Sequence, residues 1–93
     1  MTIDVVIPAH NEEALLGKTL TALSLIDEIS SIIVVDDGST DRTPDVALSH
    51  SATLISLVRN QGKSAALMAG VQVAKGEFIL MLDADLGESA SEV

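Results

Sequence analysis

The chain has 93 residues, which suits one compact unit, and its 47% apolar content favours a folded core over disorder. Fourteen acidic against five basic residues give a net charge of −9, which disfavours nucleic acid and anionic membrane surfaces as partners, and Phe78, the only aromatic residue, provides no platform for stacking single-stranded bases. Because the sequence has no cysteine, no basic leader and no apolar run of about 18 residues, we expect no disulfide, signal peptide or membrane span in these residues, and a cytoplasmic location.

Four short aliphatic runs are predicted to be strands. They are Ile3–Ile7, Ser31–Val35, Thr53–Val58 and Phe78–Leu82. Each run is continuous and rich in Val, Ile and Leu, whereas a strand with one face in water alternates apolar and polar residues. This pattern predicts strands of a parallel sheet that is covered on both faces.

Three helices are predicted between the strands. Glu12–Leu25 carries an apolar face of Leu15, Leu16, Leu20 and Leu23. Pro44 suits the first turn of the second helix, with Thr43 or Thr40 as its cap. Gln61–Ala74 carries a face made of Ala65, Leu67, Met68, Val71 and Ala74, and Gly76 follows as a stop.

The resulting order, β-α-β-α-β-α-β, predicts an α/β fold with a doubly wound parallel sheet and right-handed crossovers. Ligands of such sheets bind beyond the carboxyl ends of the strands. Four polar clusters follow the four predicted strands, so all of them are expected at that edge.

The first cluster is Pro8-Ala9-His10-Asn11-Glu12-Glu13. Pro8 is expected to end the strand ladder because it has no N–H to donate, and Asn11 or Glu12 to cap the next helix. A plain helix start explains the cluster as well as a functional site does. In the functional interpretation, backbone groups of Pro8 to His10 and the Glu12 carboxylate surround a ribose and base, and His10 is an exposed loop residue with no catalytic role.

The second cluster is Asp36-Asp37-Gly38-Ser39-Thr40-Asp41, which includes ordinary turn and cap chemistry. Two adjacent carboxylates repel each other, however, and a turn needs only one. We therefore assign Asp37 to the imide N–H of uracil, or to the amide and amine of guanine, and Asp36 or Asp41 to ordering the loop.

The third cluster is Arg59-Asn60-Gln61-Gly62-Lys63-Ser64. Gly62 allows close backbone approach, and Lys63 at a helix N-terminus either neighbours a bound phosphate or is simply exposed to water. Neither a Walker phosphate loop nor the G-x-G-x-x-G dinucleotide fingerprint is present in the sequence.

The fourth cluster contains Asp83-Ala84-Asp85, directly after an apolar run. Buried carboxylates without a counter-ion are costly. Asp83 and Asp85 are therefore expected to hold Mg²⁺ or Mn²⁺, whose preferred ligands are hard oxygens, against a diphosphate.

Together these motifs resemble the family 2 inverting glycosyltransferases of the GT-A fold, over essentially the whole chain. The resemblance implies transfer of a sugar from a UDP- or GDP-linked donor with inversion. It implies that Pro8, His10, Glu12, Val35 and Asp37 line the nucleoside, that Asp83 and Ala84 contact ribose and diphosphate, and that Asp85 binds the metal. Ala9 and Lys63 are also expected in the nucleotide-sugar site, because they lie in the same strand-end clusters. In polyprenyl-phosphate sugar transferases Leu-Gln often follows the triplet, whereas Leu86-Gly87 follows it here.

Residues 1–93 are accordingly expected to be one nucleotide-sugar-binding half-domain, truncated after the Asp-Ala-Asp motif and not competent for transfer alone. The sequence does not decide whether the sugar acceptor is a lipid phosphate or a polysaccharide. Membrane association of a longer form of the protein is consistent with either acceptor. Two alternatives remain. One is a non-catalytic domain that binds nucleotide or self-associates through exposed sheet edges. The other is a nucleotidyltransferase, although such enzymes usually have a Gly-rich basic loop after the first strand.

Overall fold

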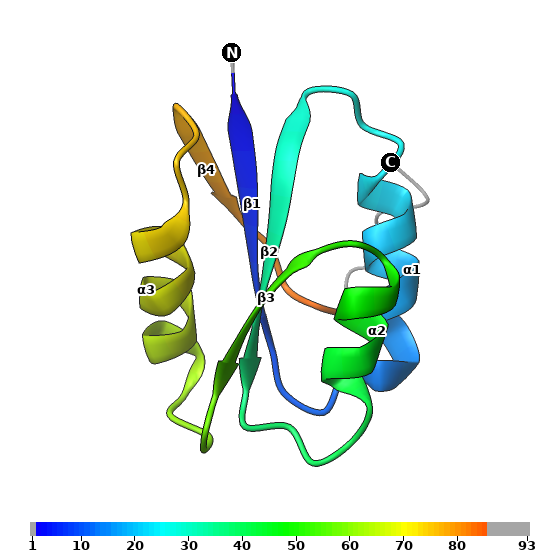
Figure 1. Cartoon of the computed structure of the whole chain (residues 1–93), viewed down its shortest axis with the longest axis vertical. Coiled ribbons are helices and arrows are strands. Elements are labelled where there is room, and N and C mark those ends of the chain that lie inside the picture. Colours follow the sequence, from blue (N-terminus) through cyan, green and yellow to red (C-terminus); the bar gives the residue numbers. More distant parts are fainter. Residues whose placement is uncertain (1, 86–93) are drawn as a thin grey trace.

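The computed structural model describes residues 2–85 and has three layers (Figure 1). A four-stranded parallel sheet in the order β3-β2-β1-β4 lies between α1 and α2 on one face and α3 on the other. The elements in chain order are β1 (Ile3–Ala9), α1 (Glu13–Leu23), β2 (Ile29–Asp37), α2 (Thr43–Ser49), β3 (Thr53–Leu57), α3 (Lys63–Val73) and β4 (Phe78–Met81). The predicted α/β fold is confirmed. No helix within residues 2–85 has the length and apolarity that a membrane span requires.

The two central strands are covered on both faces, as predicted. Val5 and Ile7 of β1 pack with Leu16 and Leu20 of α1, whereas Val6 packs in a second cluster on the α3 side. Successive side chains of a strand point to opposite faces, so a continuous aliphatic run supplies both layers at once.

The edge strand β4 departs from that prediction. All four of its residues, Phe78, Ile79, Leu80 and Met81, are exposed. The reason lies in the position of α3, which packs on β1 and β2 and leaves β4 uncovered within the described part of the chain.

The prediction that Pro8 ends the ladder is wrong, because Pro8 lies inside β1 and pairs with Val35. The carbonyl of Val6 accepts a hydrogen bond from the N–H of Leu82, on the β4 side. Residues two apart in a strand point their backbone groups to the same side, so the nitrogen of Pro8 also faces β4. Pairing with β4 ends at Val6 and Met81, and the missing N–H of Pro8 therefore breaks no ladder bond.

The buried face of α3 also differs from the prediction. Ala66 and Gly70 are buried, whereas Met68, which was assigned to the apolar face, is 60% exposed. A Cβ added to Gly70 would lie 2.3 Å from Cγ1 of Val6 and 3.2 Å from Cγ2 of Val35. This helix therefore packs close to the sheet through its smallest residues. The predicted apolar face of α1 agrees better with the structure, because Leu16, Leu20 and Leu23 are buried. Thr19 is buried beside them.

Gly70→Ala is expected to destabilise the fold by about 1–3 kcal/mol, because the new methyl group overpacks the valines beneath it. The matched change Gly17→Ala, within α1, should be neutral or stabilise by up to about 1 kcal/mol, since alanine is the better helix former. A Cβ at Gly17 would come no closer than 3.4 Å to a neighbour, the Cε1 of His50. Urea unfolding of both variants tests this, and equal effects would contradict it.

At the amino edge of the sheet, the buried carboxylate of Asp4 holds the turn that leads into β4. Its Oδ2 accepts hydrogen bonds from the N–H groups of Lys75 (2.7 Å) and Gly76 (2.9 Å), and its Oδ1 accepts one from the Ser31 hydroxyl at 2.7 Å. The Ser31 hydroxyl, and then the two backbone N–H groups, lower the pKa of Asp4 against the opposing effect of burial. Asp4 thus helps to fix where β4, and the acidic triplet after it, lie against β1.

The lowered pKa of Asp4 predicts an acid-sensitive contribution to stability. A carboxylate with a depressed folded pKa stabilises fully above its unfolded value, about 3.9, and loses that contribution as the pH falls through the folded value. Asp4→Asn should therefore cost about 1–3 kcal/mol at pH 6, and the difference from the wild type should shrink below pH 4. Chemical unfolding from pH 2.5 to 6 measures this. A difference that is constant over that range would contradict the assignment.

Candidate nucleotide and metal site

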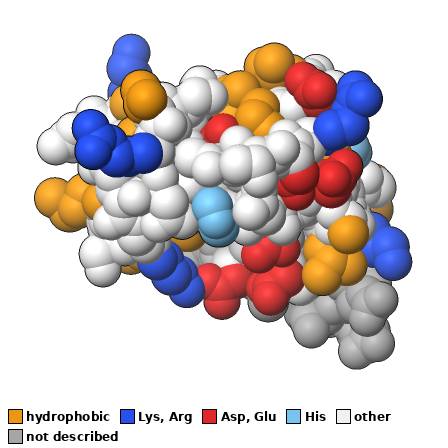
Figure 2. Space-filling model, turned by 90° about the horizontal axis from the view of Figure 1, so that it is seen from below, with side chains coloured by type: hydrophobic (Ala, Val, Ile, Leu, Met, Phe, Trp, Pro, Cys, Tyr) orange, Lys and Arg blue, Asp and Glu red, His pale blue; other side chains and the backbone are white. Residues whose placement is uncertain are grey.

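A cavity of about 380 Å³ lies at the carboxyl edge of the sheet. Ligand pockets typically measure roughly 300–1,000 Å³, so this cavity is large enough for a small molecule. Figure 2 views the molecule from this edge and shows acidic side chains gathered beside a histidine. The lining residues are Pro8, Ala9, His10, Glu12, Asp37, Asn60, Gly62, Lys63, Asp83, Ala84 and Asp85. All four strand-end clusters contribute to one cavity.

Of the residues that the sequence predicted for the site, only Val35 does not line this cavity. Its side chain is fully buried in the cluster on the α3 side, so any contact with a nucleoside would have to come from its backbone. Two lining residues, Asn60 and Gly62, were not assigned to the site from the sequence. Their position after a predicted strand, next to Lys63, was the signal that could have identified them.

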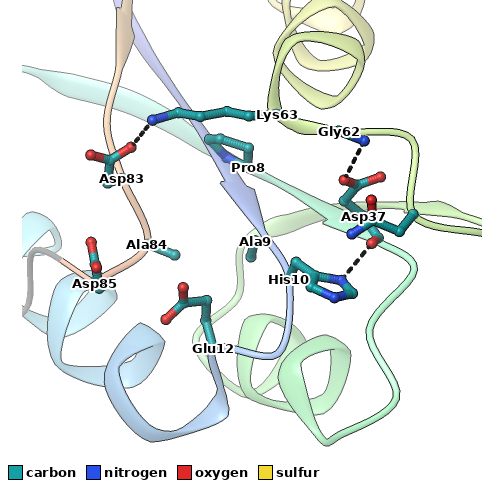
Figure 3. A pocket seen from close by; sticks show the side chains of 11 residues that line it. Pro8, Ala9, His10, Glu12, Asp37, Gly62, Lys63, Asp83, Ala84 and Asp85 are labelled. Carbon is teal, nitrogen blue, oxygen red and sulfur yellow. Dashed lines mark hydrogen bonds and ion pairs between the residues drawn. The ribbon is translucent and has the colours of Figure 1, made fainter.

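Asp37 connects three of the four loops (Figure 3). Its Oδ1 accepts a hydrogen bond from the N–H of Gln61 at 2.7 Å, and its Oδ2 accepts one from the N–H of Gly62 at 2.9 Å. Its backbone carbonyl bonds Nδ1 of His10 at 2.8 Å. Because a carbonyl only accepts, Nδ1 carries the proton, and in the neutral ring Nε2 is an acceptor. Each carboxylate oxygen of Asp37 retains a further lone pair for a ligand.

Two glycines allow this arrangement of loops. Gly38 has a φ of +69°, and a Cβ there would lie 2.4 Å from the backbone nitrogen of Asn60. Gly62 has a φ of +100°, but a Cβ there would meet nothing within 4 Å. The close approach within the protein is thus at Gly38, whereas Gly62 is required for its backbone conformation and leaves open space beside the cavity.

The side-chain hydrogen bond at the start of α1 comes from a neighbouring loop and not from the predicted caps, Asn11 and Glu12. Glu12 is the N-cap residue but forms no side-chain cap bond, and the N–H of Glu13 donates to Oδ2 of Asp41 at 3.3 Å. Oδ1 of Asp41 accepts from the N–H of Thr43 at 2.9 Å at the start of α2, whose N-cap is Arg42. Burial acts to raise the pKa of Asp41, but hydrogen bonds from the Thr43 hydroxyl and from the N–H groups of Thr43 and Glu13 outweigh it and lower the pKa.

The predicted cap Asn11 instead joins the first two loops. Its Oδ1 accepts a hydrogen bond from the N–H of Thr40 at 2.8 Å, and its own N–H donates to the Ser39 hydroxyl at 2.9 Å. Its φ of +53° is one that asparagine tolerates better than most residues. The loop that carries His10 and Glu12 is therefore held against the loop that carries Asp37.

The acidic wall of the cavity is formed by Glu12, Asp83 and Asp85. Figure 3 shows the carboxylates of Glu12 and Asp85 on the same side of the cavity, while Asp83 forms an ion pair with Lys63. Burial raises the pKa of Glu12, and the negative charges of Asp85, Asp41 and Asp83 raise it further, against a smaller opposing effect of His10. The wall therefore carries negative charge that a cation would relieve.

The donor set fits a divalent metal. Within residues 2–85 no group of three or more His, Cys, Asp or Glu side chains is arranged to hold a metal ion. Mg²⁺ is usually held by only one or two carboxylates together with substrate phosphates, and the exposed carboxylates of Asp83 and Asp85 are hard oxygen donors of that kind. The observation that favours a cation here is the gathering of the Glu12, Asp83 and Asp85 carboxylates on one cavity. Leu86 and Gly87, which follow the triplet, lie outside the described residues.

Comparison with known proteins identifies the family to which the chain is similar. Residues 4–87 match the family model described as glycosyl transferase family 2. The chain is 37% identical over 101 residues to the undecaprenyl-phosphate 4-deoxy-4-formamido-L-arabinose transferase of Aeromonas hydrophila, and 39% identical over 102 residues to that of Pectobacterium carotovorum. Each match covers 98% of this chain and 31% of the relative, so the chain spans about a third of their length.

Solved structures of GT-A transferases have the same fold. Glucosyl-3-phosphoglycerate synthase from Mycobacterium tuberculosis, solved with Mn²⁺, UDP and glucosyl-3-phosphoglycerate, superposes with a TM-score of 0.79 and 32% identity, over 89% of this chain and 33% of that one. S. aureus TarS 1–349 in complex with UDP superposes with a TM-score of 0.84 and 27% identity, over 98% of this chain and 31% of that one. The chain therefore belongs to glycosyl transferase family 2 and has the α/β architecture of the GT-A fold.

Proposed function

We propose that this chain is the donor-binding unit of a metal-dependent transferase that moves a sugar from a nucleotide-diphosphate sugar to an acceptor with inversion. The observation that carries the proposal is the convergence of four strand-end loops on one cavity, with Asp37 on one side and Asp83 and Asp85 on the other. The presence of UDP and Mn²⁺ in a structural relative supports a uridine donor, and GDP-linked sugars are the alternative.

In this proposal the cavity divides into a nucleoside part and a diphosphate part. Pro8, Ala9, His10 and Glu12 lie along the nucleoside, and the remaining lone pairs of Asp37 accept from the N–H of the base. Asp83 and Asp85 hold Mg²⁺ or Mn²⁺, which when bound neutralises the charge that develops on the leaving diphosphate. Lys63, at the start of α3, gives a second positive charge to the phosphates.

The acceptor proposed here is a lipid phosphate, with a polysaccharide as the alternative. The relatives named as undecaprenyl-phosphate transferases support a lipid phosphate. A phosphate is already ionised, so it needs no strong general base to attack, whereas a sugar hydroxyl does. We further propose a cytoplasmic site of action, with membrane association in a longer form, and that these 93 residues bind donor without transferring it.

Self-association is the second candidate, favoured by one observation. The exposed apolar strand β4 forms an edge of the sheet, and such edges pair readily with another chain. Light scattering separates the candidates: a monomer that binds nucleotide supports the donor-binding unit, and an assembly that ignores nucleotide supports self-association.

Thermal unfolding with a panel of nucleotides tests the proposed function. UDP or GDP, and their sugars, should raise the melting temperature by several degrees with Mn²⁺ present, and by much less in EDTA, because only the folded state binds. ADP serves as the comparison for base preference. No shift with any nucleotide would overturn the proposal, and equal shifts with and without Mn²⁺ would remove its metal dependence.

Lys63→Met is expected to change two affinities in opposite directions. UDP should bind about tenfold more weakly, because a charge-assisted contact with phosphate is lost. Mn²⁺ alone should bind about two- to fivefold more tightly, because an exposed ion pair worth up to about 1 kcal/mol no longer occupies Asp83. Calorimetric titration measures both. The matched change Lys75→Met, at the opposite edge of the sheet, should alter neither affinity, and a parallel loss of both affinities in Lys63→Met would contradict the prediction.

A further inference from the structure

The side chain of Thr19 is the polar member of the buried face of α1. It is fully buried, next to Leu16, Leu20 and Leu23. Its hydroxyl donates a hydrogen bond to the backbone carbonyl of Ala84 at 2.8 Å, and the alternative acceptor, the carbonyl of Leu15, is farther away at 3.4 Å. A hydroxyl has only one proton to donate, and here it goes to Ala84, which lies 65 positions away in the sequence.

Ala84 is the central residue of the acidic triplet and the only buried one of the three. It is 3% exposed and packs in the cluster on the α1 side of the sheet, whereas Asp83 and Asp85 on either side of it are exposed. Its methyl group is held by packing and its carbonyl by Thr19. With both groups held, the orientation of the peptide plane between Ala84 and Asp85 is restrained, and with it the position at which the backbone of Asp85 begins.

The same helix also carries Glu12 at its start. Glu12 is the N-cap residue of α1, and Thr19 follows it by about two helical turns. The hydrogen bond from Thr19 to Ala84 therefore joins the helix that begins after Glu12 to the triplet.

We propose that Thr19 is a positioning residue for the metal-binding carboxylates Asp83 and Asp85, a role that rests on the proposed function of the site. Thr19 does not line the cavity and acts only through Ala84. Without the hydroxyl, the buried carbonyl of Ala84 loses its partner, and the triplet turns to find another. Residues that orient metal ligands in this way typically cost about 10–100-fold in metal affinity when they are changed.

Three variants test the role. Thr19→Val removes the hydroxyl at nearly constant volume, Thr19→Ser keeps the hydroxyl, and Ile33→Val removes one buried methylene from the opposite face of the sheet as a stability control. The affinity for Mn²⁺ is measured by calorimetry on the whole chain in the presence of UDP. We expect Thr19→Val to weaken Mn²⁺ binding at least about tenfold, and Thr19→Ser and Ile33→Val to stay within about threefold of the wild type.

Thr19→Val that binds Mn²⁺ like the wild type would overturn the inference while leaving the proposed function intact. So would a Thr19→Val chain that fails to fold while Thr19→Ser and Ile33→Val bind normally, because the role would then be structural only. A wild-type chain that binds neither Mn²⁺ nor UDP would instead refute the proposed function, and the role of Thr19 with it.

Discussion

Asp85→Ala is expected to abolish the effect of Mn²⁺ on nucleotide binding. Asp85 lies on the acidic wall of the cavity, where its charge helps to raise the pKa of Glu12. Loss of this metal ligand should weaken UDP binding in Mn²⁺ by at least about tenfold, down to the affinity measured in EDTA. Binding of UDP in EDTA should stay the same, since no metal contributes there.

The stability of Asp85→Ala should stay within about 0.5 kcal/mol of the wild type, because the residue is exposed. Asp27→Ala makes the same change of charge at the opposite edge of the sheet, in an exposed loop. It should leave UDP binding in Mn²⁺ unaltered. If both variants bound UDP in Mn²⁺ with the same affinity, the overall negative charge of the protein, and not a metal ligand at Asp85, would account for the binding.

The second large effect is expected from Asp37→Asn, which should cost about 2–4 kcal/mol of stability. Both oxygens of the buried carboxylate accept backbone N–H groups, those of Gln61 and Gly62. In either orientation an asparagine amide places an NH₂ group opposite one of those donors, which then goes unpaired. For a chain of this size, 2–4 kcal/mol corresponds to a fall in melting temperature of about 8–30 °C.

Asp36→Asn is the neighbouring change with the same chemistry. Oδ1 of Asp36 accepts a hydrogen bond from the N–H of Ser39 at 3.1 Å, and an amide oxygen can replace it there. It should cost less than about 1 kcal/mol. Chemical unfolding of the two variants gives the comparison, and equal losses would show that the carboxylate of Asp37 does not hold the loop before α3.

The sequence was sufficient for the order of elements and for the edge of the sheet at which the site lies. Continuous aliphatic runs such as Val5–Ile7 have to be buried on both sides, which in turn requires helices between parallel strands. In that topology every loop after a strand reaches the same edge. Nine of the predicted site residues therefore line one cavity, although nothing about their separation in the sequence brings them together.

Long-range contacts could not be predicted in this way. The Thr19 hydroxyl donates to the carbonyl of Ala84, which is 65 positions away in the sequence. The close neighbour of Gly38 is likewise the backbone of another loop, at Asn60. On α3, apolar residues occur all around the helix, so periodicity could not identify Ala66 and Gly70 as the buried pair. Close packing against the valines of the sheet, and not hydrophobicity, selects that face.

The central claim is that the four loops form one nucleotide site whose affinity depends on a metal held by the acidic triplet. Calorimetric titration of UDP and of GDP into the wild-type chain, in Mn²⁺ and in EDTA, tests it most directly. We predict 1:1 binding of one of the two nucleotides in Mn²⁺, at least about tenfold tighter than in EDTA. Equal affinity in both conditions, or binding of neither nucleotide in either, would contradict it.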